Sequence, residues 1–537
     1  MLNRFPKTGL LLILVFLTLL MTSNGVYSVL ADSGPFRSMT IKIDVTEHEW
    51  WLVRWEDNTQ LCNLRIEHDE SPTPDEIYIH CGAKIYNTWA KSRPCAVADS
   101  NQNELCSGVY LYQVGKEKLQ KEIVVDLPVP RAWIEIVDCE FKNRSGFCSD
   151  IPSILISAEE PLPNEIVTQI QGRMNEIPFL CTGNSCEIKL RNTRDLGVPI
   201  EFWVDSSYGD SSIHYQGRIR VSKIVDEEND GYSWQVDIIS DQKDISNVEG
   251  CAKIWGSFPP LGSLPTWLEN PYYPIFLESN QPYTYLAGKL ISQGYVDASD
   301  CDDSGVSLSG FATQCGLDKS RSAVLLWQNL YNANIIRSAQ KSGVPSQIIK
   351  RLFAIESQFW PETKKALYYE YGFGHVNELG ADTALLWNQD FYFQFCPLIL
   401  DVNVCNVGYS QLDEWNQILL RGALLSEMEV DVSIPRKDIN FEQIQASMDI
   451  VAETLLGNCS QVDRMIYNET DRRAGDVSSY EDLWKFTLVN YHSGPGCLSD
   501  ALIDVLENEE KLKWADIATS LETICPEALE YVDGIVQ

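Results

Sequence analysis

Glu356 has the clearest potential for acid–base chemistry in this sequence. Five apolar side chains around it recur at three- and four-residue steps: Ile349, Leu352, Phe353, Phe359 and Trp360. This spacing predicts one apolar face of a helix that opens at Pro345 or Ser346, runs to Trp360 and is ended by Pro361. A carboxyl group on that face is desolvated by Phe and Trp, which raises its pKa. A carboxylic acid that stays protonated near neutral pH is what general-acid cleavage of a glycosidic bond requires.

A lone Glu in an amphipathic helix has an ordinary alternative, because it can lie at the edge of the apolar face and reach solvent or a nearby Lys. Three segments favour the chemical interpretation: GVPSQIIKRLFAIESQFWP at residues 343–361, GFGHVNELGADTA at 372–384 and NYHSGPG at 490–496. In order, they resemble the catalytic helix, the Gly-Leu-Met-Gln segment with its trailing Thr-Ala, and the Tyr-Asn-Ala-Gly-Pro-Gly segment of soluble lytic transglycosylases and goose-type lysozymes. The resemblance covers residues 324–501, about a third of the chain, and implies a mainly α lysozyme-like domain.

The resemblance implies a role for each matching residue. Glu356 matches the catalytic acid/base, and Tyr491 matches the tyrosine that hydrogen-bonds its carboxyl group. Ser357 matches the residue that supports the acid and helps to position the sugar. Gly374 and Asn377 match the Gly and Gln along the floor of the cleft, and Gly494 matches a glycine that keeps its loop close to the substrate.

The sequence also departs from the family pattern. Asn377 carries a shorter amide than Gln, and His375 and Val376 replace the usual apolar pair. His492 stands where Asn is usual, and Ser493 replaces Ala. We include His492 among the expected substrate-binding residues, with a surface histidine in a structural role as the alternative. These changes leave the acid, the tyrosine and the glycines in place.

Cleavage of the MurNAc-GlcNAc bond of peptidoglycan with a single Glu and without a cofactor, giving anhydro-muramyl products, is the activity that the resemblance implies. Ordinary glycosidases use two carboxyl groups, and Glu362, Glu370, Glu378 and Asp382 lie nearby in the sequence. A hydrolytic lysozyme with the same Glu therefore remains an alternative. A non-catalytic cell-wall or surface-binding protein with a degenerate lysozyme-like domain is the other.

The elements expected to position this chemistry fall into an all-β part followed by a helical part. Short segments rich in β-branched and aromatic residues predict strands at residues 40–45, 76–80, 109–114, 123–125 and 133–137. A break at residues 128–130 separates a β-rich module at 35–130 from a second at 131–222. Strands predicted at 200–204 and 215–221, joined by a polar turn, favour an immunoglobulin-like sandwich for the second module.

Residues 223–317 are rich in Pro and aromatic residues and are expected to connect the sandwich to the helical domain, with one short helix at 284–293. Residues 318–537 form the predicted lytic transglycosylase-like α domain. Its first helix is expected at 323–342, with Gly343 as its terminator.

The beginning of the chain and its cysteines indicate export. Arg4 and Lys7 precede an apolar run at residues 9–21, and a small-residue cleavage site precedes Asp32, which predicts a signal peptide at 1–31. A retained anchor is the alternative. The chain has 16 cysteines, and six pairs are close in sequence: Cys62/Cys81, Cys95/Cys106, Cys139/Cys148, Cys181/Cys186, Cys301/Cys315 and Cys396/Cys405. In an exported protein such pairs favour disulfides, so we expect a secreted or cell-surface protein.

Charge limits the choice of partners. With 42 basic and 76 acidic residues the formal net charge is −34, which argues against nucleic acid. It also argues against general electrostatic attraction to an anionic wall polymer, so peptidoglycan strands would have to be held by aromatic side chains and hydrogen bonds. The six histidines show no metal-ligand spacing, and a calcium-loop-like stretch from Asp300 has Phe311 where a Glu is needed. We expect no metal and a monomer, with a protein or surface partner open for the β-modules.

Overall fold

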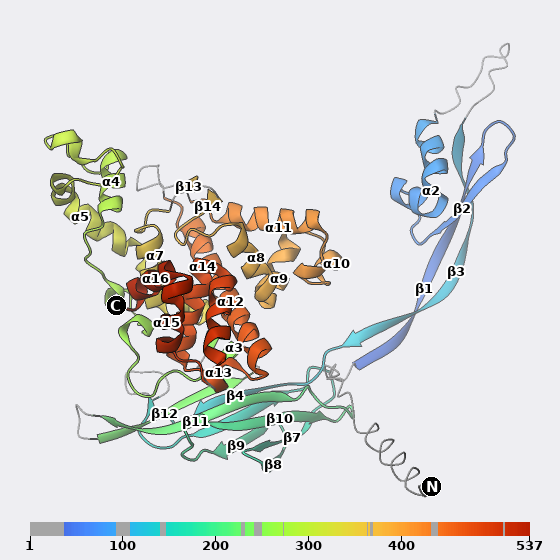
Figure 1. Ribbon diagram of the computed structural model, residues 1–537. Coiled ribbons are helices and arrows are strands. Elements are labelled where there is room, and N and C mark those ends of the chain that lie inside the picture. The colour runs from blue at the N-terminus through green and yellow to red at the C-terminus, as the bar shows by residue number, and fades with distance from the viewer. Residues whose placement is uncertain are drawn as a thin grey trace, which may run out of the picture. The chain divides into compact units, whose positions relative to one another are not determined.

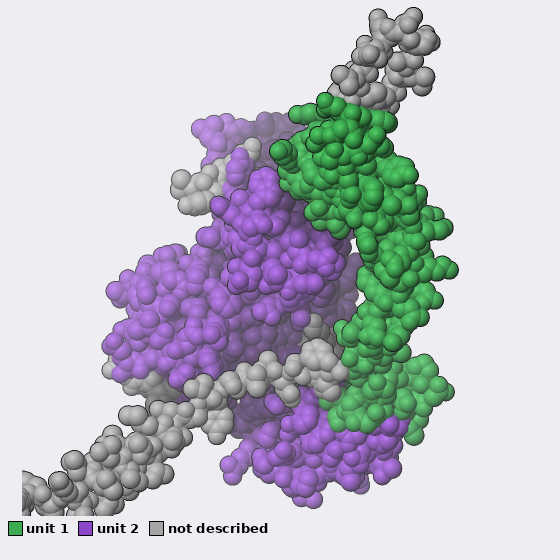
Figure 2. Space-filling model, turned by 90° about the vertical axis from the view of Figure 1, so that its right-hand side faces the viewer, with its two compact units in different colours: residues 1–130, 160–166, 208–212 green, residues 131–159, 167–207, 213–537 purple. Residues whose placement is uncertain are grey.

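A computed structural model of the protein describes residues 37–92, 108–139, 147–226, 231–240, 250–271, 273–361, 364–365, 369–430, 439–507 and 511–537. The predicted signal peptide, the predicted Cys95/Cys106 pair and Glu362 lie outside the described residues. The chain has β-structure in its N-terminal part and helices in its C-terminal part, as predicted. It divides into two compact units (Figure 2): one comprises residues 1–130, 160–166 and 208–212, and the other the rest.

The first unit is built on a long antiparallel ribbon of two strands (Figure 1). Its elements are β1 (Arg37–Arg54), β2 (Gln60–Ile66), α2 (Pro74–Lys91) and β3 (Val109–Leu127). β1 pairs with β3 along its whole length, and its last part also pairs with β2. Helix α2 packs on this three-stranded end, where Leu52, Leu64 and Ile77 form a small core.

The strand predicted at residues 76–80 is wrong, because these residues lie in α2. The Thr73 hydroxyl accepts a hydrogen bond from the backbone N–H of Glu76, and the Glu76 carboxylate accepts one from the backbone N–H of Thr73. Pro74 occupies the first helical position. This capping box starts a helix, and it overrides the β propensity of Ile77, Tyr78 and Ile79.

The second unit begins with two facing sheets. One has the strand order β4-β6-β9 and the other the order β5-β12-β11-β10-β7-β8. Their strands are β4 (Arg131–Val137), β5 (Phe147–Cys148), β6 (Ser153–Glu159), β7 (Val167–Met174), β8 (Ile177–Thr182), β9 (Ser185–Lys189), β10 (Val198–Ser206), β11 (Tyr215–Asp226) and β12 (Gly231–Ser240). Ile154, Phe202 and Ile219 are among the fully buried side chains between the sheets. The β-structure extends to Ser240, past residue 222, because β12 pairs with β11 along its length.

The region expected to connect the sandwich to the helical domain instead packs into the helical core. It contains α3 (Cys251–Trp255) and α4 (Thr284–Ser292), the latter matching the predicted short helix. Its aromatic residues Trp255 and Trp267 are buried in the same cluster as the later helices. The Trp255 indole donates a hydrogen bond to the Cys459 carbonyl, 3.1 Å away, and Cys251 forms a disulfide with Cys459.

The helical part surrounds a 30-residue helix, α12, which packs against α14 (Figure 1). Its helices are α5 (Gln314–Leu330), α6 (Asn332–Ser342), α7 (Ser346–Glu356), α8 (Glu378–Trp387), α9 (Gln389–Phe395), α10 (Val402–Cys405), α11 (Glu414–Glu427), α12 (Phe441–Thr470), α13 (Ala474–Val477), α14 (Tyr480–Leu506), α15 (Trp514–Ile524) and α16 (Pro526–Val536). A short hairpin of β13 (Lys364–Lys365) and β14 (Tyr369–Glu370) interrupts them. The helix predicted at 323–342 is broken at Tyr331, and α6 ends with Gly343 at its C-cap as predicted.

Seven disulfides join the described cysteines. Five are predicted pairs: Cys62–Cys81, Cys139–Cys148, Cys181–Cys186, Cys301–Cys315 and Cys396–Cys405. Cys251–Cys459 and Cys497–Cys525 were not predicted, because their partners lie 208 and 28 residues apart. Among the described residues, no helix has the length and apolar character that crossing a membrane requires.

Candidate active site

Glu356 is the last residue of helix α7. The helix buries Ile349, Leu352 and Phe353 on its apolar face. It ends four residues before the predicted end at Trp360, because Gln358 and Phe359 take positive φ angles of 47° and 62°. Glu356 therefore lies at a helix terminus, where the chain turns, and not in the middle of a helical face.

The chain reversal after Glu356 is held by tertiary contacts. The Gln358 side-chain oxygen accepts hydrogen bonds from the backbone N–H groups of Tyr285 and Leu286 at the start of α4. The Phe359 ring is fully buried and contacts the Tyr283 ring. These contacts offset the cost of two left-handed backbone conformations in non-glycine residues.

The Glu356 carboxyl group is mostly shielded from solvent, with 15% of its side chain exposed. One of its oxygens lies 3.3 Å from Nδ1 of His375, whose side chain is 6% exposed. The carboxyl group is therefore largely shielded from bulk water, and one residue beside it is a histidine that departs from the family pattern.

Ser357, which follows Glu356, is buried away from solvent. Its hydroxyl donates a hydrogen bond to the Phe353 carbonyl, 3.1 Å away, and the residue is 1% exposed. The described contact supports the end of α7 next to Glu356. Because Ser357 is buried, none of its described contacts supports the predicted contact with a sugar.

Residues 371–376 form a tight turn that carries His375 to Glu356. Tyr371 and Val376 exchange two backbone hydrogen bonds that close the turn. Within it, the fully buried ring of Phe373 packs against Phe353 of α7, 5.3 Å between ring centroids. Because Phe353 lies one helical turn before Glu356, this contact fixes the distance between the turn and the acid.

Gly374 and Asn377 have structural roles at either side of His375. A Cβ atom on Gly374 would lie 2.7 Å from the Tyr491 hydroxyl, so only a glycine allows this close approach. The Asn377 side chain caps α8 by accepting hydrogen bonds from the backbone N–H groups of Leu379 and Gly380. An Asn is a favoured N-cap residue, which explains the shorter amide at this position.

The segment 490–496 lies within α14 and interrupts it. Gly494 has φ 79° and ψ 174°, a conformation that is essentially restricted to glycine, and Pro495 follows it. Just before this break, the Tyr491 hydroxyl donates a hydrogen bond to the Gly374 carbonyl, 2.7 Å away. The two later motifs are thus brought together, but the described bond of Tyr491 goes to the turn and not to the acid.

Tyr491 nevertheless lies within the electrostatic reach of Glu356. Burial raises its pKa well above the ordinary value, and the negative charges of Glu356 and Glu370 raise it further. Tyr491 therefore stays protonated and acts as a neutral hydrogen-bond donor. Glu370, at the end of β14, is a second carboxylate on this side of the site.

Tyr531 of α16 is the tyrosine next to the acid, and sequence analysis did not identify it. Its pKa is raised well above the ordinary value by burial, by the charges of Glu356 and Tyr491, and by hydrogen bonding to the Glu356 carboxylate. Helix α16 also packs on α7, where the Arg351 guanidinium donates to the Ile535 carbonyl, 2.7 Å away. The separation of 175 residues from Glu356 leaves no periodic pattern that could reveal this contact.

His492 of α14 packs on the ring of Tyr531. The two rings are stacked, with 4.1 Å between centroids and 9° between planes. The Cys497–Cys525 disulfide joins the end of the 490–496 segment to the residue before α16, which keeps His492 and Tyr531 together. His492 is exposed, whereas Tyr531 is 5% exposed.

The other nearby carboxylates are engaged elsewhere. Asp382 accepts hydrogen bonds from Arg421, 2.7 Å away, and from the Tyr409 hydroxyl. Glu378 is mostly exposed and lies 4.0 Å from Arg421. A hollow of about 300 Å³ lies in this region, and its walls include Tyr371, Glu378 and Arg421.

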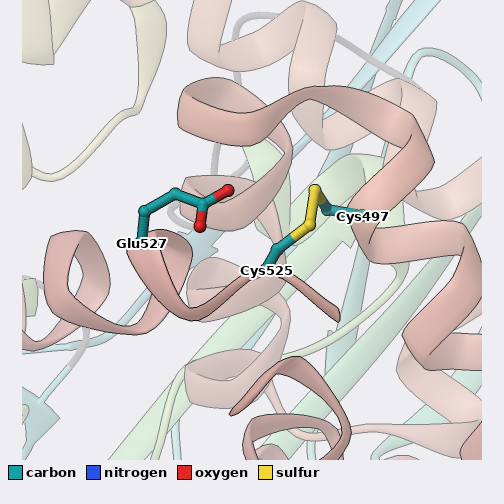
Figure 3. A group of neighbouring side chains, drawn as sticks. All are labelled: Cys497, Cys525 and Glu527. Carbon is teal, nitrogen blue, oxygen red and sulfur yellow. A yellow bond between two sulfur atoms is a disulfide. The ribbon is translucent and has the colours of Figure 1, made fainter. Parts of the chain in front are cut away.

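Among the described residues, one group of potential metal ligands comes together: Cys497, Cys525 and Glu527 (Figure 3). The two sulfur atoms are joined in a disulfide, and a disulfide has no thiolate to offer a metal. The group therefore serves to attach α16.

The structure thus brings Glu356, Gly374 and Tyr491 to one place, and adds His375 and Tyr531. No protein-family model, curated protein or solved structure matches this chain.

Proposed function

We propose that this protein is a secreted lytic transglycosylase that cleaves the MurNAc-GlcNAc bond of peptidoglycan, with Glu356 as the only acid/base. The single observation that carries the proposal is the shielded carboxyl group of Glu356 at the end of α7. His375 lies 3.3 Å from it, and its charge raises the pKa values of Tyr531 and Tyr491. The resemblance of residues 324–501 to the family supports the choice of substrate.

In the proposed mechanism Glu356 first donates a proton and later takes one up. Protonated Glu356 donates its proton to the leaving GlcNAc oxygen as the glycosidic bond breaks. The substrate's N-acetyl group stabilises the positive charge at the muramyl carbon. The Glu356 carboxylate then takes the proton from the muramyl C6 hydroxyl, whose oxygen closes the anhydro ring, and the acid is regenerated.

Two neutral tyrosines suit this cycle. Tyr531 donates to the carboxylate that forms when Glu356 loses its proton, and a donor to an anionic oxygen is stronger than one to a neutral oxygen. Tyr491 holds the turn that carries His375 by its bond to the Gly374 carbonyl. The stacked, partly exposed rings of Tyr369 and Tyr371 lie on the same hairpin and turn, and aromatic faces are suited to packing against sugar rings.

The β-modules and the disulfides are compatible with an exported enzyme whose catalytic domain is preceded by spacer modules. We propose an immunoglobulin-like sandwich and a lysozyme-like helical domain for the second unit, with the β-modules as spacers or partner-binding modules. The seven disulfides support export, because such bonds persist in oxidising compartments.

Hydrolysis by the same Glu is the second candidate, and Glu370 favours it. Hydrolysis needs a second carboxylate to act as nucleophile or to activate water. Of the carboxylates near Glu356 in sequence that the structure describes, Glu370 is the one whose charge acts on Tyr491 together with that of Glu356. If the protein is a hydrolase that uses Glu370, Glu370→Gln should abolish its activity. If it is a transglycosylase, Glu370→Gln should leave it active.

Digestion of purified peptidoglycan tests the proposal. We expect release of soluble fragments by the wild type and none by Glu356→Gln, which keeps the shape of the side chain and removes the acid. Glu522→Gln, on an exposed position of α15, is the matched control and keeps activity. A wild-type protein that binds peptidoglycan without releasing fragments would instead be a wall-binding protein.

A further inference from the structure

Strand β3 is an open edge of the sheet in the first unit (Figure 1). The strand order is β2-β1-β3, and within the described parts of the chain no strand pairs with the other side of β3. Apart from Leu119, every residue from Tyr112 to Asp126 is exposed. An edge strand presents a row of unpaired backbone N–H and C=O groups, which is a template for pairing with another strand.

Much of the ribbon in this unit has only two strands. β2 pairs with β1 from His48 to Val53, so the part of β1 before His48 pairs with β3 alone. A two-stranded ribbon is at best marginally stable in water, and further strands with an apolar face are needed for independent stability. One face of this part is apolar and carries the cross-strand pairs Met39/Val125, Ile41/Ile123 and Val45/Leu119. The ribbon therefore has both apolar surface and backbone groups left to pair.

The charges of β3 are balanced. Three lysines and three acidic residues make the strand neutral, whereas the whole chain has a formal net charge of −34. Two copies of this acidic chain can therefore meet at β3 without bringing like net charges together. Within the strand, Glu117 lies directly opposite Glu47 of β1, and directly opposed like charges destabilise a sheet. A cation placed beside Glu117 from outside would relieve this repulsion.

Two antiparallel copies of β3 are complementary in one register. When Leu119 of one copy lies opposite Leu119 of the other, Glu117 lies opposite Lys121 of the second copy. Lys116 then lies opposite Glu122, and the twofold symmetry produces each contact twice. Directly opposite residues of antiparallel strands share a face, so these pairs interact. Moving the centre by one residue in either direction sets an apolar side chain opposite Glu117.

The regular part of β3 is long enough for this pairing. The nine residues from Gly115 to Ile123 pair with β1 without irregularity, and a register shift at Glu49/Trp50 ends this stretch. At about 3.4 Å per residue it spans about 30 Å. Pairing along it joins the three-stranded sheets of two copies into one sheet of six strands. The part of the ribbon that has two strands in one copy then has four.

We propose that the protein forms a symmetric homodimer in which the β3 strands of two copies pair antiparallel, centred on Leu119. The partner is a second copy of this chain, because the charges along β3 complement those of β3 itself. The dimer replaces the monomer expected from the sequence. It does not depend on the proposed enzymatic activity.

Analytical ultracentrifugation of the full chain tests the dimer. We expect the wild type to sediment as a dimer at about 100 µM, where a dimer with a micromolar Kd is well populated. Glu117→Lys and Lys121→Glu should each weaken association at least about tenfold, because each sets two like-charge pairs across the interface. Lys84→Glu, at an exposed position of α2, is the matched control and keeps the dimer. A monomeric wild type, or a dimer that both β3 variants leave intact, overturns the proposal.

Mixing the two β3 variants tests the register. The copy with Glu117→Lys brings two positive charges to these positions and the copy with Lys121→Glu brings two negative charges, so both cross-strand pairs are again of opposite sign. We expect the mixture to associate about as strongly as the wild type. The ion pair of Lys121 with Glu67 is exposed, so its loss has little effect on stability, and melting temperatures confirm that both variants fold. If both variants fold and the mixture stays monomeric, the register is wrong.

Discussion

The imidazole of His492 lies flat on the ring of Tyr531, with 4.1 Å between their centroids. The contact joins the interrupted helix α14 to the last helix of the chain, and the Cys497–Cys525 disulfide ties the same two segments. Tyr531 in turn lies near the Glu356 carboxyl group, whose charge helps to raise the pKa of the Tyr531 hydroxyl. The end of the chain is thereby part of the active site that we propose.

Tyr531→Phe should lower kcat for peptidoglycan cleavage by about ten- to a hundredfold. The substitution removes one hydrogen bond to a charged group, which contributes about 1.5–3 kcal/mol, and that free energy corresponds to a factor of this size in rate. Tyr467→Phe, at an exposed position of α12, is the matched control. An unchanged kcat in Tyr531→Phe would remove Tyr531 from the site.

Gly374→Ala should damage the site more than its size suggests. The new methyl group would lie 2.7 Å from the Tyr491 hydroxyl and 2.9 Å from a methyl group of Val451. The turn or the tyrosine must therefore move, at a cost of about 1–3 kcal/mol. We expect a lower melting temperature and at least about tenfold lower activity, because small displacements of catalytic groups are costly. Gly422→Ala is the control, because its methyl group meets nothing within 4 Å and should leave stability unchanged. If Gly374→Ala is also as stable as the wild type, the packing argument is contradicted.

Replacing Cys497 and Cys525 together by Ser should lower both stability and activity. The disulfide closes a loop with a sequence separation of 28, and constraint of the unfolded chain by such a loop contributes between about 3 and 4 kcal/mol. Its loss also loosens α16, which carries Tyr531. The matched control is Cys181 and Cys186, with a separation of 5 in the sandwich: its removal should lower the melting temperature and leave activity intact. Equal activity losses in both variants would contradict a specific role for α16.

Lys350→Met should change how the stability of the protein depends on pH. Lys350 lies on α7 and is 4% exposed, and its ammonium group donates to the Gln328 carbonyl and to the side-chain oxygens of Asn329 and Asn332. Burial lowers its pKa to about 7. The unfolded chain thus binds more protons than the folded chain between pH 7 and the ordinary value of 10.5, so this group makes stability rise with pH in that window.

Urea unfolding across that window measures the effect. The wild type should gain stability from Lys350 as the pH rises above about 7, and Lys350→Met should lack this gain. The variant should also be less stable near neutral pH by about 1–3 kcal/mol, because three acceptors lose their donor. The same pH dependence in both proteins would show that Lys350 keeps its proton throughout.

Local patterns in the sequence predicted the features that depend on nearby residues. The apolar spacing around Glu356 located its helix, Gly343 marked the end of α6, and short cysteine spacings predicted five disulfides. The end of α7 could not be predicted in this way, because it depends on Gln358 capping α4, about 70 residues earlier. By contrast, the capping box of Thr73 and Glu76 is a local signal, and the strand prediction at residues 76–80 did not take it into account.

The residues of the candidate site were predicted only in part, because local patterns do not show which distant segments pack together. The three motifs indicated that Glu356, Gly374 and Tyr491 belong together, and the Tyr491–Gly374 hydrogen bond joins two of them. The contacts of Tyr531 and His375 with the acid depend on how α16 and the 371–376 turn pack on α7. Such contacts arise from tertiary packing, which residue periodicity does not encode.

Mass spectrometry of peptidoglycan digested by the wild-type protein and by Glu356→Gln tests directly whether the Glu356 carboxyl group breaks the glycosidic bond. We expect fragments with anhydro-muramyl ends from the wild type and no fragments from the variant. Equal release of such fragments by Glu356→Gln, or no release by the wild type, would contradict the proposal that this carboxyl group breaks the glycosidic bond.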